Sequence, residues 1–208
     1  MPTPAAVPAL LPLSLLEAIR NLDTPVEDGL DELAEEIVVR RLGLSPTVAA
    51  QIQRYRAAAV REGTVDLDEA VSVIRLAGRR PDAGLVFADA GRRAARHAVR
   101  SSGRSARTLA RMSPGGLGRR VSLRAASRLA RRVFGGELRS APAIEVRMAD
   151  PLSIVAVPDG AACTFYGAAW GELLRLLTGF EGAILHEQCR ARGADACVWC
   201  TAAAEVYE

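Results

Sequence analysis

Four cysteines and one histidine near the end of the 208-residue sequence are the residues best suited to chemistry. All four cysteines lie between Cys163 and Cys200, and His186 lies among them. Thiolates and imidazole are the usual ligands of a structural zinc ion, which needs about four of them in a tetrahedron. In a cytoplasmic chain disulfides are disfavoured, so we expect the cluster to hold a metal, with zinc the first choice.

The spacing selects most of the ligand set and leaves one position open. Cys189 and Cys197 flank a glycine-containing turn, so antiparallel pairing would bring their sulfurs together. His186 precedes Cys189 by three residues, and Cys163 stands at the start of a predicted helix, whose terminal amides favour a thiolate. Because Cys200 forms a C-x-x-C pair with Cys197, either Cys163 or Cys200 could complete the set.

Charge divides the chain into three parts. All 27 basic residues are arginines, which excludes mechanisms that need a lysine nucleophile or a P-loop lysine. Residues 1–78 carry 7 arginines and 12 acids, residues 79–139 carry 16 and 3, and the remainder carries 4 and 9. A strongly cationic middle is therefore flanked by two acidic parts.

Residues 1–78 predict a small helical bundle. Apolar residues recur there at helical spacing in four stretches, separated by proline or glycine. The stretches are Leu13 to Leu22, Leu30 to Leu42, Val48 to Val60 and Leu67 to Leu76.

One segment of this bundle, Arg41 to Arg56, also has the pattern of a helix-turn-helix. Its second helix carries Gln51, Gln53, Arg54 and Arg56. The net negative charge of residues 1–78 disfavours DNA binding, because duplex affinity rests mainly on neutralised phosphates. A helical hairpin that packs or dimerises is the alternative.

The cationic middle predicts two helices, one from Ala83 to Leu109 and one after Pro114. The second has an apolar stripe of Leu117, Val121, Ala125, Leu129 and Val133 beside a row of Arg120, Arg124, Arg128 and Arg132. Such a helix suits nucleic acid, an anionic membrane surface or a ligand with carboxylates. Its arginines could equally pair with the acidic parts of the same chain. Aromatic residues are too few here for single-strand binding.

The last part predicts strands around one helix. Ile144 to Met148 alternates, and the branched run Leu152 to Val157 with the turn Asp159-Gly160 suggests a β-hairpin. A helix from Thr164 to Thr178 and strands at Ala183 to Cys189 and Ala196 to Ala202 follow. The expected fold is α+β, with an antiparallel sheet packed with helices in residues 79–208, preceded by the N-terminal helical bundle.

Two stretches around the cysteines, Cys163 to Leu177 and His186 to Trp199, resemble the 4-vinyl reductase domain family. That family typically shows a cysteine before a helix, then a glutamate, a cysteine shortly after it, a glycine and a further cysteine. A weaker likeness at 89–96, in the basic helix and at 149–152 points to the bacteriochlorophyll 4-vinyl reductase-like branch. Residues 1–78 show no such likeness.

The resemblance implies a ligand set and a pocket. Related sensors of aromatic compounds, at the front of bacterial transcription activators, hold zinc with three cysteines and a glutamate. The matching positions here are Cys163, His186, Cys189 and Cys197. This favours Cys163 over Cys200 and puts His186 where the family has glutamate, although Glu187 could serve after a one-residue shift.

The family's fold is similar to that of vesicle-tethering subunits that hold an acyl chain, which implies an apolar pocket near the metal. Candidate lining residues are Phe165, Tyr166, Trp170 and Trp199.

We therefore expect a zinc-containing sensor or carrier of a hydrophobic or aromatic small molecule, acting through a partner or the N-terminal helices. Catalysis is disfavoured, because no dinucleotide, flavin or iron–sulfur motif supplies electrons and three thiolates with imidazole close the zinc shell. Of the two histidines, His97 is expected to be merely exposed. The alternatives are an accessory or reductase-type protein of bacteriochlorophyll (tetrapyrrole) biosynthesis, and a structural or regulatory dimer or DNA-binding regulator.

We also expect a cytoplasmic homodimer without an integral membrane segment. Prolines interrupt the apolar opening of the chain, and no run reaches the ~20 apolar residues of a membrane-spanning helix. Nucleic acid remains a less favoured partner.

Overall fold

The computed structural model describes residues 6–24, 45–102, 116–140 and 143–203. The helices are α1 (Leu10–Asp23), α3 (Pro46–Val60), α4 (Leu67–Gly78), α5 (Ala83–Ser101), α7 (Gly116–Leu129), α8 (Leu152–Ala156) and α9 (Cys163–Thr178), with a π-helical turn at Ala130–Phe134 and a 3-10 turn at Arg190–Arg192. The strands are β1 (Ala6–Pro8), β2 (Thr64–Asp66), β3 (Glu137–Arg139), β4 (Glu145–Met148), β5 (Gly182–Gln188) and β6 (Cys197–Ala203).

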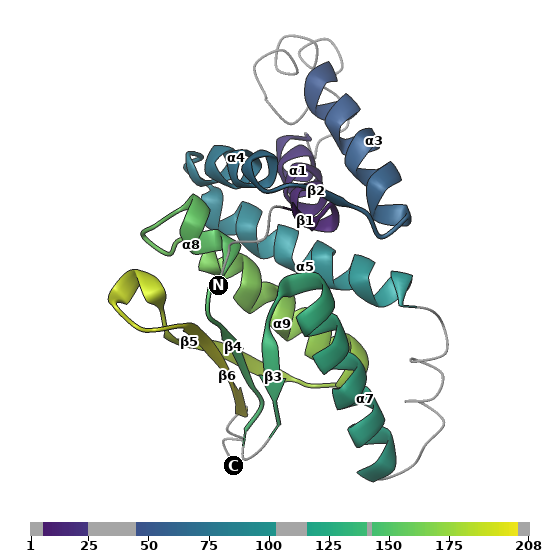
Figure 1. The fold of residues 1–208 in the computed structure, drawn as a ribbon, viewed down its shortest axis with the longest axis vertical. Helices are drawn as coiled ribbons and strands as arrows, with labels where there is room; N and C mark the ends of the chain where they lie inside the picture. The colour runs from purple at the N-terminus through teal and green to yellow at the C-terminus, as the bar shows by residue number, and fades with distance from the viewer. Residues whose placement is uncertain (1–5, 25–44, 103–115, 141–142, 204–208) are drawn as a thin grey trace.

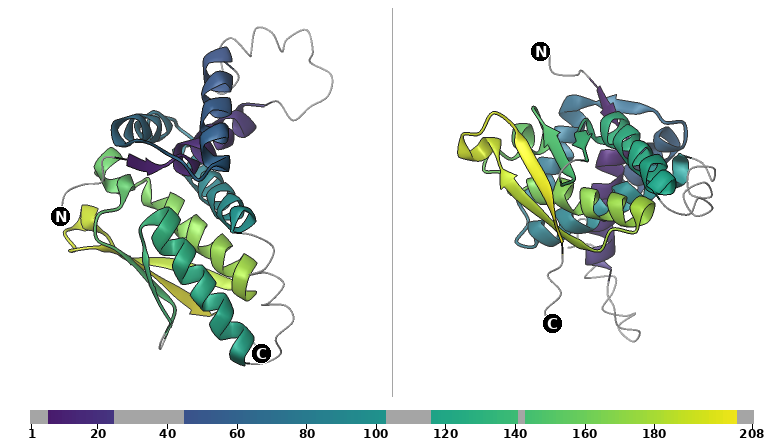
Figure 2. Two further views of the ribbon diagram at one scale, coloured as in Figure 1. Left: turned by 45° about the vertical axis from the view of Figure 1, so that its right-hand side comes forward. Right: turned by 90° about the horizontal axis from the view of Figure 1, so that it is seen from below.

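The described elements form layers around α9. A four-stranded antiparallel sheet has the order β3-β4-β6-β5, and a short ribbon pairs β1 with β2. In Figure 1, α9 lies between this sheet and α5, with α1, α3 and α4 beyond α5. Figure 2 shows α7 running beside α9. The predicted α+β class with an antiparallel sheet is confirmed.

The contact between α5 and α9 is close enough for the two backbones to touch. A Cβ atom at Gly91 of α5 would lie 2.1 Å from the carbonyl oxygen of Phe165 and 3.0 Å from the backbone nitrogen of Ala169, both on α9. The facing side of α5 otherwise presents mainly small buried residues, namely Ala90, Ala94, Ala95 and Ala98. Only glycine fits at position 91, because real Cβ atoms do not approach a backbone oxygen so closely.

The N-terminal helices pack directly on this pair. Helix α1 is buried along almost its whole length, because α3, α4 and α5 surround it. One continuous hydrophobic cluster extends from Val7 to Trp199, so it includes residues on both sides of position 78. The two regions on either side of residue 78 therefore share one core. Their division into two domains stays a prediction.

Buried carboxylates link the helices through arginine and histidine. Glu17 of α1 accepts hydrogen bonds from Arg56 of α3 (2.7 Å) and His97 of α5 (3.1 Å). Burial alone would raise the pKa of Glu17, but these two partners outweigh it and lower the pKa to about 2. His97 is therefore an ion-pair partner, and the expectation of a merely exposed side chain was wrong.

A second buried carboxylate joins α5 to α9. Glu172 accepts hydrogen bonds from Arg96 of α5 (2.7 Å) and from Arg175 of its own helix (2.8 Å). The hydrogen bond from Arg175 is the main reason that the pKa of Glu172 falls to about 2, and the bond from Arg96 adds to it against the opposing effect of burial.

The predicted hairpin at Leu152 to Val157 was wrong. Leu152–Ala156 is one helical turn, α8, which starts after Pro151 and closes with a 2.8 Å bond from the Val157 amide to the Ser153 carbonyl. A branched apolar run forms a strand only where a neighbouring strand is free to pair with it. Here β3 and β6 pair with the two edges of β4, so this segment cannot form the predicted hairpin with β4, and Pro151 at its start begins the helical turn instead.

The other predicted elements agree with the structure within a few residues. Helices α1, α3, α4, α7 and α9 and strands β4, β5 and β6 lie where the sequence predicts them, and the short strands β1, β2 and β3 are additions. The predicted helix at Leu30 to Leu42 lies outside the described residues. So do the last residues of the Ala83 to Leu109 helix, which is helical to Ser101.

The helix-turn-helix prediction lies partly outside the described residues. Its second helix is α3, where Arg54 forms an ion pair with Glu69 and Arg56 pairs with the buried Glu17. These two arginines are therefore engaged within the chain.

Replacing Gly91 with alanine should destabilise the fold by at least about 2 kcal/mol, because the added methyl group must push α5 away from α9. Gly84→Ala on the same helix is the control, since a Cβ there has nothing within 4 Å and alanine favours helix by up to about 1 kcal/mol. Urea unfolding of both variants measures the difference. Equal stabilities would contradict the backbone contact.

Lowering the pH should remove the contribution of Glu172 to the free energy of unfolding. Its folded pKa of about 2 lies below the ordinary value of 4.5, so its contribution is complete above about pH 4.5 and disappears as the pH falls toward 2. Glu172→Gln should flatten the pH dependence of the unfolding free energy in that window. Glu137→Gln, on the exposed edge strand β3, should leave the dependence as in the parent chain.

Candidate metal centre

Three cysteines and one histidine meet at one end of α9. The candidate ligand atoms of Cys163, His186, Cys189 and Cys197 all lie within 4.8 Å of one another. The three cysteines are at most 4% exposed, and none forms a disulfide. This Cys3His group could hold a metal ion, and it is the ligand set that the sequence and the resemblance together favoured.

A β-bulge makes the histidine and the second cysteine face the same way. In a regular strand, residues three apart point to opposite faces. Strand β5 has an irregularity between His186, which pairs with Trp199, and Gln188, which pairs with Val198. The extra residue, Glu187, shifts the alternation by one, so His186 and Cys189 both reach the cluster.

The same alternation explains why Cys200 lies outside the cluster. Cys197 and Cys200 are three residues apart on the regular strand β6, so their side chains point to opposite faces of the sheet. Cys200 is partly exposed and hydrogen-bonds to Glu187, which together with burial raises its pKa to about 11. Glu187 accordingly does not replace His186 in the cluster.

The donor set and its spacing fit a tetrahedral metal. The sulfurs of Cys189 and Cys197 are 3.9 Å apart. Ligands about 2.3 Å from a zinc ion are roughly 3.8 Å from one another in a tetrahedron. The buried Nε2 atom of His186 has no hydrogen-bond partner among the described residues, and a coordinated cation would supply one.

Residues around the cluster orient the ligands. The Cys163 sulfur lies 3.3 Å from the Ser153 hydroxyl, and the backbone amide of Arg190 donates a hydrogen bond to the Cys197 sulfur (3.4 Å). The His186 ring stacks on Trp199, with 4.6 Å between ring centres and an interplanar angle of 8°. Such contacts around the ligands fix their orientation in metal sites.

Glycine 160 is needed for the chain to pass beside the cluster. Its φ of 82° lies in the left-handed region, and a Cβ there would be 3.1 Å from the Cys189 sulfur and 3.0 Å from the Ala191 Cβ. Ser153 and Gly160 were not predicted as part of the site. The sequence held no signal for Ser153, because its segment was expected to be a strand.

Burial favours the neutral forms of Cys163, Cys197 and His186 when no cation is bound. It raises the pKa of the Cys163 thiol to about 12, and the neighbouring Cys197 and Cys189 thiols contribute to the rise. It likewise raises the pKa of Cys197 and lowers that of His186, to which Arg192 adds. Coordination requires thiolates and neutral imidazole, so metal binding must release protons and weaken as the pH falls.

The four aromatic residues predicted to line a pocket take two positions. Phe165 and Tyr166 line an apolar cavity beside the metal cluster. Trp170 and Trp199 are not among its lining residues. They are buried in an aromatic cluster, where Trp170 packs against Phe134 with 5.1 Å between ring centres.

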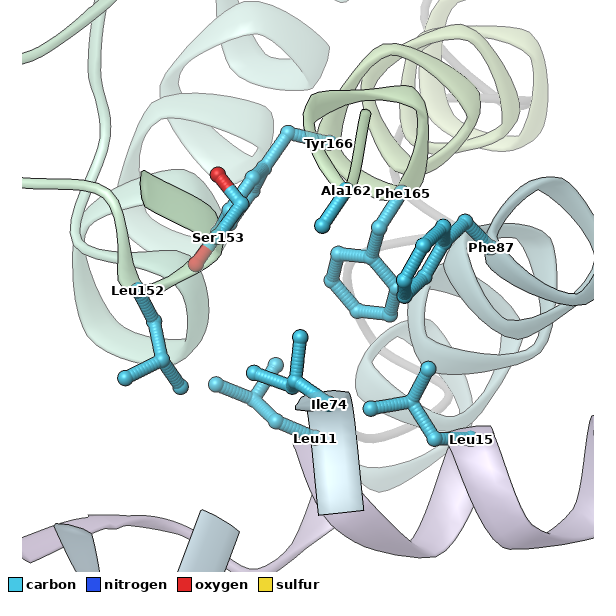
Figure 3. A pocket seen from close by; sticks show the side chains of 9 residues that line it. All are labelled: Leu11, Leu15, Ile74, Phe87, Leu152, Ser153, Ala162, Phe165 and Tyr166. Atoms are coloured by element: carbon cyan, nitrogen blue, oxygen red, sulfur yellow. The ribbon is translucent and has the colours of Figure 1, made fainter. Parts of the chain in front are cut away.

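The cavity lies where the N-terminal helices meet α8 and the start of α9, as Figure 3 shows. Its volume is about 20 Å³, room for about one water molecule. Helices α1, α4, α5, α8 and α9 all contribute to its wall. The lining residues are Leu11, Leu15, Ile74, Phe87, Leu152, Ser153, Ala162, Phe165 and Tyr166.

Comparisons of the chain with models of protein families, with curated proteins and with solved structures found no match. In the described residues, no helix combines the length and apolar character needed to cross a membrane. The fold and the site therefore define the class on their own: a mixed α+β chain with a Cys3His group able to hold a metal ion.

Replacing any of the three clustered cysteines with serine should abolish metal retention, because three remaining donors hold the ion weakly in a buried site. Protein purified without added metal should contain about one equivalent, and Cys189→Ser should contain less than about a fifth of that by elemental analysis. Cys200→Ser is the matched control and should retain the parent content. Equal loss in Cys200→Ser would contradict the assignment of Cys163 as the fourth ligand.

Proposed function

We propose that this chain is a zinc-containing binding protein for a small apolar or aromatic molecule, and that the N-terminal helices respond to that ligand. Zinc is the metal that best suits three thiolates and one imidazole in a closed tetrahedral shell. Such a shell leaves no open position for substrate, which supports a structural role for the ion and a binding role for the protein.

One observation carries the ligand proposal: the apolar cavity is next to the metal cluster and spans both regions of the chain. Ser153 lines the cavity and also contacts the Cys163 sulfur. Tyr166 lines it too, and burial raises the pKa of this residue, so its hydroxyl stays protonated. The opposite wall is formed by Leu11 and Leu15 of α1 and Ile74 of α4. A ligand here would contact the N-terminal helices directly.

The cavity volume limits the ligand. Pockets for drug-sized molecules measure about 300–1,000 Å³, whereas this cavity measures about 20 Å³. Binding of even a single aromatic ring therefore requires α1 and α4 to move away from α8 and α9. This movement of α1 and α4 would tell a partner whether the ligand is bound. The small volume of the cavity favours a small ligand over a tetrapyrrole.

The resemblance of the cysteine-containing stretches to the 4-vinyl reductase domain family supports the same proposal. It associates a cysteine-rich zinc site with a neighbouring apolar pocket. Membership of that family and the homodimer remain proposals, and the bacteriochlorophyll alternative is the less favoured proposal because the cavity is small.

Toluene and naphthalene added to the zinc-loaded protein should raise its melting temperature, because a ligand that binds only the folded state stabilises it. Leu15→Ala enlarges the cavity and should increase this shift, while Ala162→Leu fills the cavity and should abolish it. Hydrogen exchange should change in α1 and α4 when the ligand binds.

Leu173→Ala is the control for the enlarged cavity. Leu173 is fully buried in α9 but does not line the cavity, so its variant loses comparable core packing and opens space elsewhere in the core. The proposal is wrong if neither compound shifts the melting temperature of the parent or of Leu15→Ala. It is also wrong if Ala162→Leu keeps the ligand response of the parent, or if hydrogen exchange in α1 and α4 does not change on ligand binding to Leu15→Ala.

A further inference from the structure

Helix α7 presents a row of arginines that neither the metal cluster nor the cavity uses. Arg120, Arg124 and Arg128 are all exposed and are spaced four residues apart. They therefore share one side of the helix, about 6 Å apart along its axis. The opposite side, which includes Ala125 and Ala126, is buried toward the rest of the chain. We call these three residues the α7 arginine row.

The acidic residues within the described ranges do not pair with this row. Where the structure describes internal ion pairs, they use other arginines: Arg96 pairs with Glu172, and Arg132 pairs with Glu62. No residue of the α7 arginine row forms an ion pair with an acidic residue in the described ranges. Among the described residues, internal compensation of charge, one of the alternatives from the sequence, thus applies to α5 and to Arg132, and not to the three residues of the α7 arginine row.

The α7 arginine row borders an open hollow whose side chains are suited to bind a phosphate. An open hollow of about 470 Å³ is lined by Val121, Arg124, Ser127 and Arg128. Two guanidinium groups and a hydroxyl are typical donors to phosphate oxygens in protein–DNA contacts. Arginine suits this role well because its planar fork can donate two hydrogen bonds to one phosphate.

Other anionic partners fit the surface less well. A membrane-binding helix needs exposed apolar side chains beside its basic residues, and none of the exposed large hydrophobic residues in the described ranges lies on α7. They are Leu22, Val60, Leu85, Val155 and Leu185. Single strands need exposed aromatic rings for stacking, and no described aromatic side chain is exposed.

We propose that α7 is a docking surface for duplex DNA and that it contacts the phosphate backbone without reading the bases. The observations that carry this proposal are the unneutralised row and the adjoining hollow, within a segment of 16 arginines and 3 acids. Each neutralised phosphate releases condensed counterions, which makes such binding steeply dependent on salt. The proposal does not rest on the metal or on the cavity ligand.

The test measures binding of the full zinc-loaded chain to a fluorescein-labelled 30-base-pair duplex of mixed sequence, by anisotropy between 50 and 200 mM KCl. The triple variant R120Q/R124Q/R128Q should bind at least about tenfold more weakly at 100 mM KCl. Its slope of log affinity against log salt should be smaller by about 2 to 3, since each lost phosphate contact removes about 0.9.

Two further variants separate this contact from a general charge effect. R61Q/R79Q/R139Q removes the same charge from exposed arginines on other elements and should stay within about threefold of the parent. R120K/R124K/R128K keeps the charge, and its affinity for the duplex should also stay within about threefold of that of the parent. This variant keeps the proposal testable if the glutamine variant folds poorly.

Four results would overturn the proposal. The first is that the parent chain shows no salt-dependent binding to the duplex, and the second is that R120Q/R124Q/R128Q binds as tightly as the parent. The third is that R61Q/R79Q/R139Q loses as much affinity as R120Q/R124Q/R128Q. The fourth is that the parent binds phosphatidylserine vesicles or polyglutamate at least as tightly as the duplex. Duplex binding that is lost only in the α7 glutamine variant would support it.

Discussion

The closeness of α5 to α9 is the constraint on which the rest of the molecule depends. The two helices approach until only a glycine fits between their backbones at position 91. Helix α9 begins with the candidate metal ligand Cys163, supplies part of the cavity wall through Phe165 and Tyr166, and packs Trp170 toward the sheet. Helix α5 in turn supports α1. The distance between these two helices therefore sets where the metal cluster lies relative to the N-terminal helices.

Polar groups reinforce this arrangement where the helices meet. Glu17 and Glu172 are both buried, and each is held by two basic partners from different positions along the chain. A carboxylate buried without such partners would be costly. These pairs explain part of the uneven distribution of charge along the chain, because acids of one region meet arginines of another. Arg120, Arg124 and Arg128 of α7 face solvent.

The metal cluster and the cavity form one unit in the structure. The cluster joins the start of α9 to both strands of the β5–β6 hairpin, so a bound ion would connect the helix to the sheet. Ser153 on α8 touches both the cluster and the cavity. A change in the cavity can consequently reach the metal ligands through one side chain, and the N-terminal helices through the opposite wall. This is the physical basis for treating the ion as structural and the cavity as the variable part.

The sequence by itself determined most of the helices, three strands of the sheet and the types of the candidate ligands, since these depend on local patterns. Helical periodicity located α1, α3, α4, α7 and α9, and the clustering of cysteines around His186 indicated a metal site. Strand alternation, once β6 is known to be a strand, also excludes Cys200, because residues three apart cannot share a face.

The tertiary structure decided what depends on contacts between distant segments. The bulge at Glu187 turns His186 and Cys189 to one face, and no local pattern marked it. The run from Leu152 does not form a hairpin with β4, because β3 and β6 pair with both edges of that strand. Four of the nine lining residues come from helices about 65 to 155 residues away in sequence, and their side chains look like ordinary core. Spacing along the chain predicts which residue types occur together, but only packing determines which faces meet.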